Sequence, residues 1–153
     1  RGLQLDPSHL PSALIGKPLP EFKLAHLESK DETILSRKDL VNGKPFLLNV
    51  WGTWCALCIH EHPFLLKLAD QGVRIIGVSY NDENQAALDW LDRYKSPYEL
   101  NIVDSEGTLG LDLGVYGAPE TYVVDGEGTI LYRHAGVLDK KVWQTHMAHL
   151  MIQ

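Results

Sequence analysis

Phe-Leu-Leu-Asn-Val-Trp at residues 46–51 and Trp-Cys-Ala-Leu-Cys at residues 54–58 decide the fold of this chain. The first stretch is apolar at almost every position, which is typical of a central strand that is buried on both faces. The second stretch holds the only two cysteines of the protein, Cys55 and Cys58, directly after that strand. The pair therefore lies where a strand ends and a helix is expected to begin.

A Cys-x-x-Cys pair at such a strand-to-helix junction is suited to reversible thiol chemistry. We expect the helix to run from Cys55 to about Asp70 and to end at Gly72. Its N-terminus carries partial positive charge and free N–H groups, which stabilise a thiolate at Cys55. The thiolate is the reactive form in thiol-disulfide exchange, and the two-residue spacer lets Cys58 reach Cys55.

Length and composition exclude several classes of protein. The 153 residues indicate one domain with a substantial core. The net charge of -6, without a basic stripe, argues against nucleic acid and against an anionic membrane surface as partners. Two cysteines cannot form the disulfide framework of a small secreted domain.

No apolar stretch is long enough to span a bilayer, and the first four residues are not a signal peptide. The chain is either cytosolic or the soluble part of something larger, and an acidic monomer is the default.

The N-terminal part is expected to divide into an arm and a hairpin. Residues 1–17 show no firm period and are interpreted as a loose arm before a single domain at residues 18–153. Residues 18–27 and 32–35 predict a short hairpin that leads the domain.

The remaining pattern predicts an α/β fold. Strands and helices that alternate imply βαβ units with a parallel core, and a hairpin adds antiparallel strands. The expected elements are a strand at residues 73–79, a helix capped by Asp82 and Gln85, hairpin strands at 121–125 and 129–133, and a last helix from about Asp139. Together with residues 46–51 they predict a central mixed β-sheet flanked by helices.

This arrangement resembles the thioredoxin fold over most of the chain after Pro18. Pro63, five residues after the second cysteine, matches a proline in the helix of that family. Pro119 resembles the family's cis-proline, whose loop packs against the cysteine pair and binds extended substrate backbone. The resemblance implies a thioredoxin-like fold with an N-terminal β-hairpin extension. The residues expected to bind substrate are Trp54, Tyr116, Ala118 and Pro119.

A narrower resemblance lies in Gly-Val-Tyr-Gly-Ala-Pro-Glu-Thr-Tyr at residues 114–122, which is similar to the signature of the CcmG/DsbE proteins of cytochrome c maturation. Members of that subfamily are periplasmic, reducing and anchored to the inner membrane by an N-terminal segment. The resemblance implies a protein-disulfide reductase whose client is apocytochrome c or another disulfide-bearing protein. It also implies a membrane electron donor of the DsbD or CcdA type, an anchor absent from this chain, and no cofactor.

The resemblance also assigns roles to the site residues, although one position departs from thioredoxin. Asn49 stands where thioredoxin has a buried aspartate, and Asn49 cannot take a proton. The subfamily pattern supplies Glu61 and Glu120 as the acids instead. We expect Cys55 to be the nucleophile and Cys58 to resolve the mixed disulfide. Glu61 follows Cys58 by three residues on the same helical face, so a partly buried Glu61 is expected to accept its proton. Glu120 is expected to share this role or to couple to Glu61.

Two alternatives stay open at this point. One is a reductase of the ResA/TlpA type with other clients, and the residues between the cysteines, Ala56 and Leu57, leave the redox potential undecided. The other is a metal-binding or metal-delivery module that uses Cys55 and Cys58. We expect no metal, because half of a four-ligand site is missing and the histidines at 60 and 62 are interpreted as solvated surface residues.

Overall fold

The structure, a computed structural model, describes residues 13–152, and its centre is a five-stranded sheet. The strand order is β5-β4-β3-β6-β7. The central strand β3 (Phe46–Trp51) is buried at all six positions, as its apolar sequence predicts. It pairs in parallel with β4 (Ile75–Tyr80) and antiparallel with β6 (Glu120–Val124). The predicted mixed α/β sheet is therefore confirmed.

The outer strands complete the sheet on both sides of this core. β5 (Leu100–Asp104) pairs in parallel with β4, and β7 (Ile130–Ala135) pairs antiparallel with β6. The β6–β7 pair is the predicted hairpin, turning through residues 125–129. β5 has no counterpart among the predicted elements, because Asn101 and Asp104 interrupt its apolar pattern.

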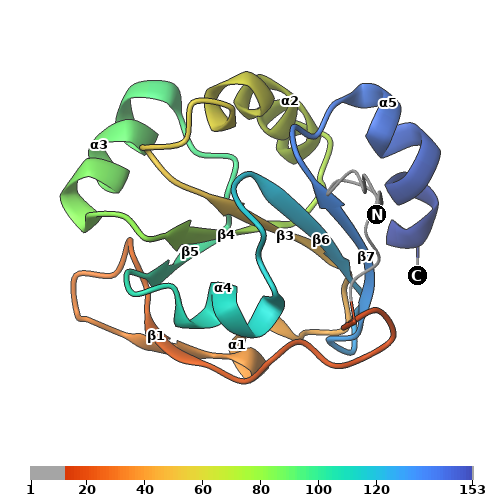
Figure 1. The fold of residues 1–153 in the computed structure, drawn as a ribbon, viewed down its shortest axis with the longest axis horizontal. Helices are drawn as coiled ribbons and strands as arrows, with labels where there is room; N and C mark the ends of the chain where they lie inside the picture. The colour runs from red at the N-terminus through yellow and green to blue at the C-terminus, as the bar shows by residue number, and fades with distance from the viewer. Residues whose placement is uncertain (1–12, 153) are drawn as a thin grey trace, which may run out of the picture.

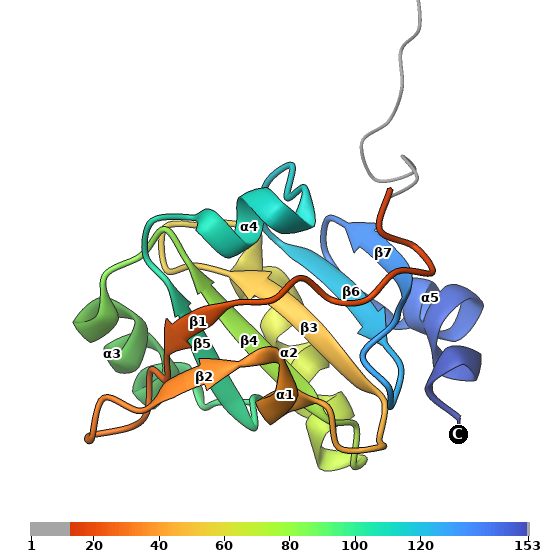
Figure 2. The same cartoon turned by 90° about the horizontal axis from the view of Figure 1, so that it is seen from below.

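Helices cover both faces of the sheet, and the N-terminal hairpin adds to one of them (Figure 1). One face carries α2 (Cys58–Asp70), α3 (Asn84–Tyr94) and a C-terminal helical segment formed by α5 (Lys140–Val142), η2 (Trp143–Met147) and η3 (Ala148–Met151). The opposite face carries α1 (Arg37–Leu40), α4 (Thr108–Leu113) and the hairpin strands β1 (Lys23–Ala25) and β2 (Ile34–Ser36). Figure 2 shows that hairpin crossing beneath the sheet, which confirms the predicted extension.

Strand alternation decides which side chains of β3 meet the cysteines. Leu47 and Trp51 pack in the core cluster that contains Cys55 and Cys58, whereas Leu48 and Val50 pack in the cluster on the other face. Because successive strand residues point to opposite faces, Asn49 shares the face of Leu47 and Trp51. The one polar residue of the central strand therefore points toward α2.

The N-terminal segment is attached to the sheet at two places. Gly16 N–H donates to the Ile130 carbonyl at 2.7 Å, and Ile130 N–H donates to the Lys17 carbonyl at 2.9 Å. The end of the predicted loose arm is thus paired with β7, while residues 1–12 lie outside the described residues. Farther on, Glu28 accepts hydrogen bonds at 2.9 Å and 2.8 Å from the backbone and side-chain N–H groups of Asn101.

Within residues 13–152, no helix has the length and apolar character needed to cross a bilayer.

Candidate active site

The two cysteines lie between the end of β3 and the start of α2 and form a disulfide, with their Cα atoms 5.4 Å apart. Cys55 keeps 7% of its surface exposed and Cys58 only 2%. The predicted helix start at Cys55 is wrong, because α2 begins at Cys58. Cys55 instead lies in a turn, where its N–H donates to the Gly52 carbonyl at 3.1 Å. Both sulfur atoms nevertheless lie at the positive end of a helix of 13 residues.

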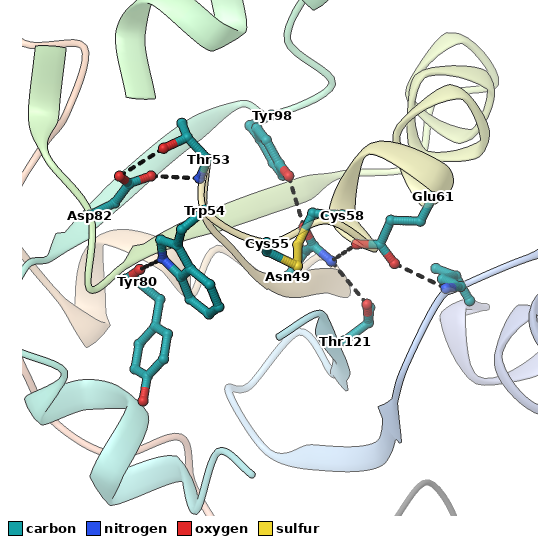
Figure 3. The surroundings of a disulfide bond; sticks show 11 residues. Asn49, Thr53, Trp54, Cys55, Cys58, Glu61, Tyr80, Asp82, Tyr98 and Thr121 are labelled. Atoms are coloured by element: carbon teal, nitrogen blue, oxygen red, sulfur yellow. Dashed lines mark hydrogen bonds between the residues drawn. A yellow bond between two sulfur atoms is a disulfide. The ribbon is translucent and has the colours of Figure 1, made fainter. Parts of the chain in front are cut away.

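The turn before the cysteines is held by the loop that follows β4. Thr53 donates to Asp82 from its backbone N–H at 2.7 Å and from its hydroxyl at 2.9 Å. The predicted capping box of Asp82 with Gln85 is therefore wrong, and Glu83 is the N-cap of α3. Trp54 donates from Nε1 to the Tyr80 carbonyl at 2.9 Å while half of its surface stays exposed beside the disulfide (Figure 3).

Glu61 is a buried carboxyl group, 1% exposed, one helical turn after Cys58. Its Oε2 accepts a hydrogen bond from Asn49 Nδ2 at 2.8 Å, and its Oε1 accepts one from Leu138 N–H at 2.9 Å. Burial raises the pKa of Glu61 from 4.5 to about 7, and the two hydrogen bonds lower it in part. A group that exchanges its proton near neutral pH is therefore present on the Cys58 face of α2.

Asn49 connects Glu61 to two residues that the sequence did not assign to the site. Asn49 Nδ2 also donates to Thr121 Oγ1 at 3.0 Å, and the Tyr98 hydroxyl donates to Asn49 Oδ1 at 2.8 Å (Figure 3). Tyr98 comes from the irregular segment before β5, and its ring stacks on Trp51 at 5.6 Å between centroids. The only sign of this network in the sequence is Asn49, a polar residue within an apolar strand.

Glu120 lies on the other face of the sheet from Glu61. Thr121 points toward Asn49, so its strand neighbour Glu120 points away. Its carboxylate accepts from the N–H groups of Tyr116 at 2.6 Å and Gly117 at 3.0 Å. The other donors to this carboxylate are the Tyr122 hydroxyl at 2.9 Å and the Arg133 guanidinium at 3.0 and 3.1 Å. The structure therefore does not bring the two carboxylates together.

The loop expected to bind substrate has the predicted backbone geometry. The peptide bond between Ala118 and Pro119 is cis, which confirms the prediction made from the resemblance. Ala118 packs against the cluster that contains both cysteines. Tyr116 is 70% exposed two residues before Ala118. The loop thus packs partly against the core cluster of the cysteines and exposes one aromatic ring to solvent.

The two histidines after Cys58 differ from each other. His60 is exposed, as expected. His62 is buried: its Nε2 lies 2.7 Å from the Lys95 carbonyl and its ring meets Trp90 edge-on, so the prediction of a solvated His62 is wrong. Burial lowers the pKa of His62. Across residues 13–152, no three His, Cys, Asp or Glu side chains are grouped closely enough to hold a metal ion.

Comparison with known proteins agrees with this geometry. The Redoxin family model matches residues 14–148. The thiol:disulfide interchange protein DsbE of Pseudomonas aeruginosa is 56% identical over 153 residues, which is 100% of this chain and 84% of the relative. DsbE of Escherichia coli is 50% identical over 145 residues, 95% of this chain and 78% of the relative. A thio-disulfide isomerase from Thermus thermophilus has the same fold, with a TM-score of 0.71 at 23% identity over 91% of this chain and 98% of that one.

Three findings thus agree: a disulfide at a strand-to-helix junction, a cis-proline loop that packs against the same core cluster, and relatives that are at least 50% identical in sequence. The chain therefore belongs to the Redoxin family and is a thiol-disulfide oxidoreductase of the DsbE type.

Proposed function

We propose that the protein reduces client disulfides in the periplasm and that its client is apocytochrome c with oxidised haem-attachment cysteines. The observation that carries the proposal is the order of burial at the site. Cys55 is 7% exposed, Cys58 is 2% exposed, and Glu61, one turn farther along α2, is 1% exposed. The similarity to DsbE proteins and the loop at residues 114–122 support the choice of client.

The chemistry runs through two exchanges. The Cys55 thiolate attacks a client disulfide, so a bond forms between Cys55 Sγ and one client sulfur while the client disulfide breaks and its other sulfur leaves as a thiolate. Cys58 then gives its proton to Glu61 and attacks Cys55 Sγ, which releases the second client thiolate. The client gains two electrons, and the protein reaches the disulfide form seen in the structure.

Glu120 takes a different part in this proposal from the acid role first expected. Its carboxylate is fully engaged by the Arg133 guanidinium and by the N–H groups that precede the cis-proline. We assign it the positioning of Tyr116 and Pro119, which would line the client groove together with Trp54. A membrane donor of the DsbD or CcdA type would return the electrons, with the domain held at the inner membrane by a further segment.

Replacing Glu61 with glutamine is expected to slow resolution of the mixed disulfide by about 100-fold or more, since a general base contributes at least that much. In the native protein the resolution rate should rise with pH through about 7, because only the ionised form of Glu61 can accept the proton. Glu61→Gln should lose this inflection while formation of the mixed disulfide stays unchanged. Rapid acid quenching followed by mass spectrometry would measure both steps.

The matched control is Glu127→Gln, which removes one exposed carboxylate from the β6–β7 turn. Its formation and resolution rates should equal those of the native protein. Unchanged resolution in Glu61→Gln would show that Cys58 loses its proton to another group.

Client choice is tested with reduced protein and a disulfide-bonded peptide that carries a haem-attachment motif. A second peptide with the same loop size but a shuffled sequence serves as the comparison, and the redox potential is measured against glutathione buffers. We expect faster reduction of the haem-attachment peptide and a potential near that of thioredoxin, about -270 mV. Equal rates for both peptides would favour a reductase of the ResA/TlpA type, and a potential near about -120 mV, as in DsbA, would overturn the reducing direction.

A further inference from the structure

Asn49 is a fully buried amide whose two ends contact different partners. Nδ2 donates to Glu61 and to Thr121, while Oδ1 accepts from the Tyr98 hydroxyl (Figure 3). A half-turn of the amide would exchange its oxygen and nitrogen with almost no change of shape. The end that faces Glu61 is therefore decided by the partners and not by packing.

While Glu61 is ionised, it allows only one orientation of the Asn49 amide. A carboxylate accepts hydrogen bonds and cannot donate them, so an ionised Glu61 requires Nδ2 on its side. A protonated Glu61 could instead donate to Oδ1 of a turned amide. Thr121 tolerates both orientations, because its hydroxyl either accepts or donates.

Tyr98 is the partner that distinguishes the two orientations. Burial holds the pKa of Tyr98 well above its usual range, so its hydroxyl keeps its proton near neutral pH. That hydroxyl donates to Oδ1 across 2.8 Å in the observed orientation. A turned amide would present N–H groups to the Tyr98 oxygen and leave the buried O–H without this acceptor, which is costly.

We propose that Tyr98 is a positioning residue for the redox reaction, which fixes the Asn49 amide so that it donates to Glu61 and keeps that carboxyl group ready to take a proton. The inference rests on the proton-accepting role proposed for Glu61. It adds Tyr98 as the residue that, through Asn49, determines how readily Glu61 takes a proton. Tyr98 itself need not contact the client or the sulfur atoms.

The other titratable groups near this network are few and come from several elements. Besides burial, the charge of Glu61 and, less strongly, that of Glu28 in the loop between β1 and β2 raise the pKa of Tyr98. Asp139 adjoins Leu138, but its carboxylate caps α5 by accepting from Val142 N–H at 2.9 Å. Among residues 13–152, the ring of His62 is turned to the Lys95 carbonyl, and Cys58 at the start of α2 does not titrate while it forms the disulfide. None of them lies between Tyr98 and Asn49, which are in direct contact.

The test is the titration of Glu61 followed by carboxyl ¹³C NMR in the oxidised protein, with Glu61→Gln used to assign the signal. Tyr98→Phe should raise the midpoint by about half a pH unit to one pH unit, the scale expected from losing one hydrogen bond. The matched control, Tyr94→Phe, alters an exposed ring of α3 that lies tilted against Trp90, and should leave the midpoint unchanged.

A double variant separates orientation of the amide from general loosening of the core. In an Asn49→Ala background, Tyr98→Phe should cause no further shift, because there is no amide left to orient. An unchanged midpoint in Tyr98→Phe, or an equal shift with and without Asn49, would overturn the inference. The measurement needs neither client nor turnover, so its outcome is independent of the kinetics of Glu61→Gln that test the proposed function.

The native protein provides a second measurement if Tyr98→Phe does not fold. With tyrosines labelled at Cζ, the Tyr98 signal should move with the same midpoint as the Glu61 carboxyl signal, since the amide links the two groups. A Tyr98 signal that stays constant across the Glu61 titration would equally refute the inference.

Discussion

Replacing Cys58 with alanine is expected to abolish turnover and to leave the client covalently attached to the protein through Cys55. Cys55 is the more exposed of the two cysteines and lies at the positive end of α2, so it can still attack a client disulfide. Without the Cys58 thiol, no group is positioned to break the mixed disulfide from within. Non-reducing electrophoresis followed by peptide mass mapping would detect the adduct and identify the sulfur that carries it.

Cys55→Ala is the matched variant for this experiment. It should lose activity to the same background level but accumulate no adduct, because Cys58 is only 2% exposed. An adduct on Cys58 in that variant, or turnover retained in either single variant, would contradict the assignment of nucleophile and resolving cysteine.

Replacing Arg133 with methionine is expected to lower the free energy of unfolding by about 3–5 kcal/mol, the usual cost of stranding one member of a buried ion pair. The side chain of Glu120 is 1% exposed and that of Arg133 is 7% exposed, with 3.0 Å between Arg133 Nη2 and Glu120 Oε2. Removal of the guanidinium leaves a buried carboxylate without its counter-charge. Urea unfolding of the oxidised proteins at neutral pH measures the difference.

An exposed ion pair gives the matched control. Glu21 lies 2.9 Å from Arg37 and its side chain is 68% exposed, so Glu21→Gln should cost less than about 1 kcal/mol. Adding Glu120→Gln to Arg133→Met should recover part of the loss, because the stranded charge is then gone. A cost for Arg133→Met as small as that of the control would mean that the pair contributes no net stability.

Elements whose signal lies in their own residues were predictable. The apolar run of β3, the glycine turn between β6 and β7, and the end of α2 at Asp70, two residues before Gly72, all agree with expectation. β5 was not predictable in this way. Its buried Asn101 is satisfied by Glu28 and accepts from Trp51 Nε1 at 2.8 Å, and both partners are distant in the sequence.

The same distinction applies to the candidate site. The cysteine pair and the cis-proline are local patterns that a resemblance can carry. Tyr98 enters only because β5 is the neighbour of β4, which brings the segment before it against Asn49. Glu120 follows the cis-proline in the sequence, yet strand alternation turns it away from Glu61. Glu120 was expected near Glu61 because it follows Pro119 in the sequence, but the strand face on which its side chain lies determines its position.

The N-terminal segment has one more consequence, for association between molecules. An open sheet has two outer strands whose unpaired backbone groups invite other chains to add on. Here residues 16–19 pair with residues 128–130, in the turn before β7 and at its first residue. The same segment then crosses beneath the sheet to β5, where Leu27 N–H donates to the Asn101 carbonyl at 2.9 Å (Figure 2). The N-terminal segment thus covers part of both edge strands, which leaves fewer unpaired backbone groups for another chain to pair with.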